Sequence, residues 1–291
     1  MNGMRGRFRL SARSSLKQPG TFGTTEPFGR LDVDARRVLE VLNRDRHLDS
    51  LGALAHSLQD ARPERTLNRT AIAFDTNVLL RLGNHSKSAD IIDYLTSASF
   101  GGSIILPGQV IQEFWNNQLN AVDSLAASIR KKFEALSAEV SKIDDRFYNF
   151  EERFNTLLEE FRGTFGHAYD GGTAGRLGIV VKFLQEKAIV PYVSRAPFAE
   201  MAVARKRTRT PPGFKDDGDG DFYVWVDLLA GLLQIRRSGT QIDRVALLSQ
   251  DRKLDWSRDG IPHPILAAEV EALTGATFEI WTLDQLAGKL P

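Results

Sequence analysis

The sequence contains no cysteine, which excludes a disulfide framework, a thiolate metal site and a cysteine nucleophile. It therefore fits a reducing compartment, and we expect a cytoplasmic protein. No apolar run reaches the roughly 18 residues of a membrane span, because Asp227 interrupts the best candidate, so no membrane association is expected. The histidines show no ligand spacing, and neither the P-loop of nucleotide-binding proteins nor a GxSxG elbow occurs.

Excess charge of one sign is also missing, since 38 Lys and Arg oppose 37 Asp and Glu. This near-balance argues against a surface that binds polyanions throughout. The charge is nevertheless uneven, because residues 1–70 carry a net +5 and the remainder a net −4. The first 25 residues hold five Lys and Arg and no acid among Gly, Ser and Thr, so residues 1–30 are predicted to form a disordered basic arm.

Apolar periodicity predicts the fold class. Helical spacing over residues 31–69 indicates a helical extension. Buried strands are predicted for TAIAF, SIILP, RVALL and TFEIW, and helical patterns alternate with them. This alternation predicts a three-layer α/β/α sandwich with a central parallel sheet over residues 70–291.

A heptad-like apolar seam over residues 125–161 predicts a long helical arm, inserted at about 117–200. Two interpretations remain open. The arm either folds back on itself as an antiparallel pair, which its many phenylalanines favour, or it binds a protein partner or a second copy of the chain.

Four acidic residues stand where a parallel sheet would place a site, at or near the carboxyl ends of strands. They are Asp75, Glu113, Asp221 and Asp251. Each alone is equally compatible with a helix cap or a solvated acid. Together they form a set of hard oxygen ligands that select Mg²⁺ or Mn²⁺, and such ions support phosphodiester hydrolysis.

The motifs that carry these acids resemble the PIN-like nuclease superfamily, especially its branch with a long helical insertion between the second and third acidic motifs. The resemblance rests on FDTNVLL, PGQVIQEFWNN, TPPGFKDDGDGDFYVWVDLL and VALLSQDRKLDW, and on the C-terminal HPILAAEVEALTGATFEIWTLDQL. It runs from about residue 70 to the end, so residues 1–69 lie outside it.

The resemblance implies that the four acids are the catalytic, metal-binding carboxylates. It also implies that Asn77 and Ser249 orient the metal shell, and that Asp255 belongs to a DW motif with Trp256. Asp216 matches a position that either clamps a loop or ligates. Because the DDGDGD run is dense in acids, the third ligand is either Asp219 or Asp221; we choose Asp221, which directly precedes the aromatic helix.

A basic run before the acidic loop is predicted either to bind substrate phosphates or to be a solvated helix end. It consists of Arg205, Lys206, Arg207 and Arg209. The predicted function is a Mg²⁺- or Mn²⁺-dependent nuclease, with RNA as the favoured substrate and a toxin, defence or RNA-processing role. The alternatives are a nuclease that acts on DNA, and a binding or assembly module that acts through the helical arm.

Overall fold

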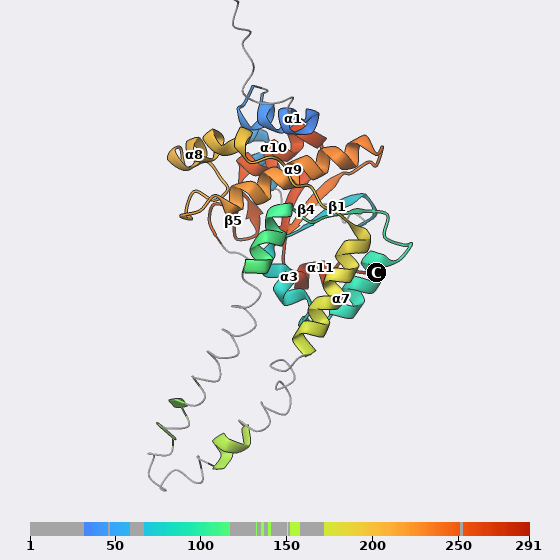
Figure 1. Cartoon of the computed structure of the whole chain (residues 1–291), viewed down its shortest axis with the longest axis vertical. Coiled ribbons are helices and arrows are strands. Elements are labelled where there is room, and N and C mark those ends of the chain that lie inside the picture. Colours follow the sequence, from blue (N-terminus) through green and yellow to red (C-terminus); the bar gives the residue numbers. More distant parts are fainter. Residues whose placement is uncertain are drawn as a thin grey trace, which may run out of the picture. The chain divides into compact units, whose positions relative to one another are not determined.

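A computed structural model describes residues 32–45, 47–58, 67–116, 172–250 and 253–291, with short stretches between 132 and 157 (Figure 1). These residues belong to one compact unit, Asp32–Pro291. The predicted basic arm and most of the predicted helical arm lie outside the described residues. No described helix is both long and apolar enough to cross a membrane.

The centre of the unit is a five-stranded parallel sheet with strand order β3-β2-β1-β4-β7. Its strands are β1 (Thr70–Phe74), β2 (Ser103–Ile105), β3 (Ala188–Ile189), β4 (Arg244–Leu248) and β7 (Thr277–Trp281). Every residue of β1 and β4 is buried, as expected for central strands covered on both faces. The predicted α/β fold with a central parallel sheet is therefore confirmed.

Helices cover both faces of this sheet (Figure 1). On one face lie α1 (Val33–Leu42), α2 (Ser50–Ser57), α9 (Gly220–Arg237) and α10 (Pro264–Thr274), which contact one another. On the other face lie α3 (Thr76–Leu82), α4 (Ser88–Thr96), α7 (Gly172–Lys187) and α11 (Leu283–Ala287). The two helices before the sheet thus pack into the same unit as the rest of the described chain.

A helix over residues 108–116 begins after Pro107. Further elements are η1 (Leu67–Arg69), η4 (Ala196–Phe198), α8 (Ala199–Arg207), and the antiparallel strands β5 (Ser257–Arg258) and β6 (Ile261–Pro262). Strand β3 joins the central sheet at Ala188, within the insertion predicted for about 117–200.

A buried ion pair joins the helices on the α9 side of the sheet. Glu269 of α10 is 1% exposed and accepts hydrogen bonds from Arg205 Nη1 at 2.7 Å and from Trp225 Nε1 at 2.7 Å. Arg205 lies in the last turn of α8 and also donates to the carbonyl of Pro211. Glu269 therefore holds α8, α9 and the loop before α9 together.

Candidate active site

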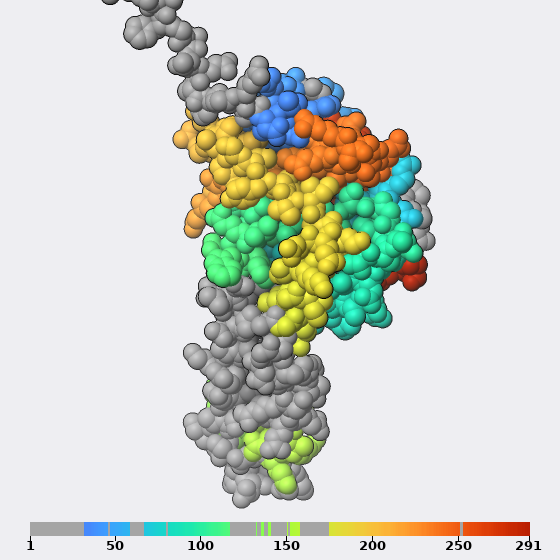
Figure 2. Space-filling model, turned by 45° about the vertical axis from the view of Figure 1, so that its right-hand side comes forward, coloured from blue at the N-terminus to red at the C-terminus, as the bar shows by residue number. Residues whose placement is uncertain are grey.

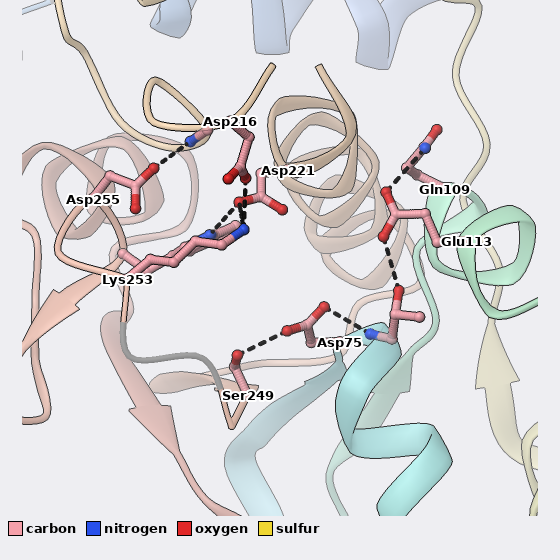
Figure 3. Close-up of polar contacts among 11 residues, drawn as sticks. Asp75, Gln109, Glu113, Asp216, Asp221, Ser249, Lys253 and Asp255 are labelled. Atoms are coloured by element: carbon pink, nitrogen blue, oxygen red, sulfur yellow. Dashed lines mark hydrogen bonds and ion pairs between the residues drawn. The ribbon is translucent and has the colours of Figure 1, made fainter. Parts of the chain in front are cut away.

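Asp75 lies where β1 ends and α3 begins, and it caps that helix. Its Oδ1 accepts a hydrogen bond from the backbone N–H of Thr76 at 2.7 Å, and its Oδ2 accepts one from Ser249 Oγ at 2.7 Å. Ser249 follows β4, and the Asp75 backbone donates to the carbonyl of Leu248, the last residue of that strand. The two central strands thus fix the position of this carboxylate, and the Ser249 hydroxyl is bonded to it (Figure 3).

Glu113 reaches the same edge of the sheet from the helix over residues 108–116. Its Oε2 accepts from Thr76 Oγ1 at 3.0 Å, and its Oε1 accepts from Gln109 Nε2 at 3.1 Å. Thr76 therefore links the first two predicted acids, because its backbone N–H donates to one and its hydroxyl to the other. A Cβ atom added at Gly220 would lie 2.4 Å from Glu113 Oε1, so Glu113 also lies against the start of α9.

Asp221 is in the first turn of α9, and Figure 3 shows its carboxylate pointing into the same space as that of Asp75. Its Oδ2 accepts from Trp256 Nε1 at 3.0 Å and from Lys253 Nζ at 3.1 Å. Burial raises the pKa of Asp221 to about 6, even though the indole N–H and the ammonium group both lower it. The pKa of Asp221 is therefore closer to neutral pH than the ordinary value for an aspartate.

Lys253 bridges two acids, since its Nζ also lies 2.6 Å from Asp216 Oδ2. Burial raises the pKa of Asp216, but hydrogen bonds with Lys253 and Asp221 and the charges of Lys253 and Lys206 together lower it below its ordinary value. Asp216 is thus an ion-pair partner of Lys253 beside Asp221.

Asp255 holds the loop before α9. It is fully buried, and its Oδ2 accepts from the backbone N–H of Gly213 at 2.9 Å. Gly213 has a positive φ of 80°, and a Cβ atom there would lie 3.1 Å from Asp221 Cβ, so this turn packs directly against the site. Asp255 therefore acts as a loop clamp, which was one of the two roles considered for Asp216.

The structure separates the two candidates for the third acid. Asp219 Oδ1 pairs with Lys206 Nζ at 2.9 Å, whereas Asp221 lies beside the other site residues. This arrangement favours Asp221. Asn77 Oδ1 accepts from the backbone N–H of Gln250 at 3.2 Å and so holds the loop after β4. Asp251, the fourth predicted acid, lies outside the described residues.

The predicted basic run does not form a single surface patch. Arg205 is 3% exposed and bound to Glu269, so its role here is structural, and that part of the prediction is corrected. Lys206 is paired with Asp219. Arg207 and Arg209 are exposed and remain available to contact phosphates.

Sequence reasoning missed the contacts that position Glu113. Asp227, inside α9, is fully buried and accepts from the backbone N–H of Gln109 at 2.9 Å and from Arg195 Nη1 at 2.8 Å. Arg195 in turn donates to Gln109 Oε1 at 3.1 Å, and the segment after β3 packs beside the helix over residues 108–116 (Figure 2). The sequence did hold one signal, because Asp227 is an acid within an apolar stretch of α9. Burying a carboxylate is costly unless it is paired, so such a residue indicates a buried partner.

The side chains at this edge are of the chemical type that binds hard divalent cations. They are carboxylates on separate elements, with no thiol or imidazole among them. As they stand, no three acidic or histidine side chains among the described residues form a group that could hold a metal ion. Lys253 engages Asp216 and Asp221, and Asp251 lies outside the described part of the chain.

A comparison with known protein families agrees with the fold described above. Residues 71–162 match the family described as PIN like domain, and this stretch contains β2, all of β1 except Thr70, and both Asp75 and Glu113. Neither a curated protein nor a solved structure matches the chain. The parallel α/β fold is consistent with this match, and PIN-like domains are generally nucleases.

Proposed function

We propose that the protein is a metal-dependent phosphodiesterase that cuts RNA internally. The observation that supports this most is the placement of Asp75, Glu113 and Asp221, on three separate elements, along one edge of the sheet in a chain that matches the PIN like domain. Carboxylates placed this way repel one another, and divalent cations relieve that repulsion. A toxin, a defence effector and an RNA-processing enzyme would all use such a site, and each is compatible with this proposal.

Each described residue has a distinct task in this proposal. Asp75 and Glu113 are the primary cation ligands, and Thr76 fixes the spacing between them through its two hydrogen bonds. Asp221 is the third ligand and Asp251 the fourth. When bound, a Mg²⁺ or Mn²⁺ ion activates water for attack and stabilises charge on the phosphate. Hydrolysis then leaves a 5′-phosphate and a 3′-hydroxyl.

The proposal is tested with purified full-length protein and end-labelled single-stranded and hairpin RNA. We expect internal cleavage with Mg²⁺ or Mn²⁺ and none with EDTA. Matching DNA oligonucleotides in the same assay determine whether the enzyme prefers RNA. Absence of metal-dependent cleavage of every substrate would refute the proposed activity.

Replacing Gly220 with alanine should lower activity with little change in stability. The added methyl group would lie within 2.4 Å of Glu113 Oε1, the end of a flexible side chain that has to move away. Because a misplacement of about 1 Å at a reacting group can cost roughly a hundredfold in rate, we expect a loss of that order. Cleavage rate and melting temperature are the two measurements.

Gly178→Ala is the matched control, because Gly178 is also helical and a Cβ atom there meets nothing within 4 Å. Its cleavage rate should equal that of the wild type. Normal activity in Gly220→Ala would show that Glu113 does not need its observed position.

Metal binding should weaken as pH falls through about 6. Asp221 has its pKa raised to about 6 by burial, so it is mainly protonated below that pH and mainly charged above it. A protonated ligand has to lose its proton before it binds a cation, so each pH unit below the pKa costs about 1.4 kcal/mol of binding free energy. The stabilisation by Mn²⁺, measured as a rise in melting temperature, should be nearly constant from pH 7 to 8 and much smaller at pH 5.

Asp221→Asn serves as the comparison, because it removes the titrating group and should leave a small Mn²⁺ effect at every pH. An Mn²⁺ effect in the wild type that is equal at pH 5 and pH 7 would rule out Asp221 as a ligand.

A further inference from the structure

Two aromatic side chains are exposed beside the candidate site. Trp115, on the helix over residues 108–116, is 69% exposed, and Tyr192, after β3, is 59% exposed. Gln112 connects them, because its Oε1 accepts from Tyr192 Oη at 3.2 Å and it lies one turn before Trp115 on the same helix. We call the surface made of Gln112, Trp115 and Tyr192 the aromatic face. The other three tryptophans of the chain are buried.

Tyr192 is held firmly although its side chain is exposed. The guanidinium carbon of Arg195 lies 4.4 Å from the centroid of the Tyr192 ring and 4.7 Å from that of the Tyr223 ring. Arg195 is itself fixed by Asp227, through contacts of 2.8 and 3.0 Å. A Cβ atom added at Gly108 would overlap Tyr192 Cδ2, so the ring also packs closely against that backbone. A ring that is fixed in advance loses little freedom when it binds a ligand.

The aromatic face adjoins the candidate acids. Arg195 Nη2 donates to Gln109 Oε1 at 3.1 Å, and Gln109 Nε2 donates to Glu113 Oε1 at 3.1 Å. Two side chains thus connect the Tyr192 ring to Glu113. The charge of Arg195 is neutralised by Asp227, so this surface offers ring area and not a free cation. Its chemistry therefore suits a base, whereas a phosphate would need an unpaired positive charge.

We propose that the aromatic face stacks unpaired bases of a single-stranded RNA substrate, next to the phosphate that lies at the candidate acids. This inference rests on the proposed function and specifies the form of its substrate. Exposed aromatic rings bind single strands because every base has a π face, and they do so with little regard to sequence. In a duplex the bases stack on one another, so they cannot reach a ring on the protein surface.

The test measures how tightly the full-length protein binds a short, unstructured, fluorescein-labelled RNA, by fluorescence anisotropy in EDTA and without added metal. Stacking is worth about five- to hundredfold in affinity per base, so Tyr192→Leu and Trp115→Leu should each weaken binding about fivefold or more. Tyr192→Phe keeps the ring and should bind as the wild type does. Leu51→Ala, which shortens a 76% exposed apolar side chain on α2, should also bind normally. A blunt RNA duplex should bind all of these proteins equally.

Wild-type affinity for the single strand in a folded protein that carries both leucine substitutions would overturn the inference. An equal loss of affinity for single strand and duplex, or no binding of the single strand by the wild type, would do the same. Circular dichroism checks folding, and each single substitution tests its own ring if the double variant does not fold.

Failure of the inference is distinguishable from failure of the proposed function, because binding is measured without metal. Weaker binding by the leucine variants, with no RNA cleaved by the wild type in Mg²⁺ or Mn²⁺, overturns only the function. Metal-dependent cleavage by the wild type, with normal binding by the leucine variants, overturns only the inference.

Discussion

Asp75→Asn is expected to reduce RNA cleavage about a thousandfold or more while the protein remains folded. Asparagine has the same shape, and its amide oxygen can still accept from the Thr76 N–H, as Asp75 Oδ1 does at 2.7 Å. The amide nitrogen would face Ser249 Oγ, which can accept as well as donate. The substitution therefore removes mainly a charge. Loss of several kcal/mol of transition-state stabilisation corresponds to this factor, since each 1.36 kcal/mol is about tenfold.

Single-turnover cleavage of labelled RNA measures this effect, and circular dichroism and the melting temperature check that the protein is folded. Asp93→Asn is the control, because Asp93 is an exposed aspartate on α4. It should cleave at the wild-type rate. An Asp75→Asn protein within tenfold of the wild type would show that this carboxylate does not take part in the reaction.

Glu269→Ala is expected to have the largest effect on stability, a loss of about 3–5 kcal/mol. The substitution leaves the Arg205 guanidinium group, 3% exposed, without its carboxylate. It also leaves the indole N–H of Trp225 without an acceptor. The unpaired guanidinium group stays buried in the folded protein, where it loses the carboxylate and does not regain contact with water. The folded state therefore loses the attraction of the ion pair and also bears the desolvation cost of the charge. Urea unfolding monitored by tryptophan fluorescence gives the difference in unfolding free energy.

Glu271→Ala is the matched control, since Glu271 lies on the same helix but is exposed. It should change the unfolding free energy by less than about 0.5 kcal/mol. A loss of less than 1 kcal/mol in Glu269→Ala would mean that the buried pair contributes little to holding α8, α9 and α10 together.

The central strands and the ends of the helices could be predicted because their causes are local. A continuous apolar run specifies β1, and β1 has no exposed residue. Gly275 ends α10 in the left-handed conformation with φ 75°, and Thr282 forms a capping box at the start of α11. The site could be placed for the same reason, since residues that follow parallel strands meet at one edge of the sheet.

The contacts that complete the site could not be predicted, because they join residues far apart in the chain. Asp227 and Gln109 are 118 residues apart, and no periodicity marks their hydrogen bond. Strand β3 has only two residues and owes its place to pairing with β2. For Arg205 the local pattern was misleading. Its place in a basic run suggested a role at the surface, but the residue is buried and pairs with Glu269. Local patterns thus place the carboxylates, whereas tertiary contacts determine their partners.

The most direct test of the proposed function is end sequencing of RNA treated with purified protein and Mn²⁺, for the wild type and for Asp75→Asn. In the wild-type sample only, we expect new internal 5′ ends that carry a phosphate and ligate without further treatment. The same ends at equal abundance in the Asp75→Asn sample, or 5′-hydroxyl ends in both, would contradict hydrolysis by this carboxylate site.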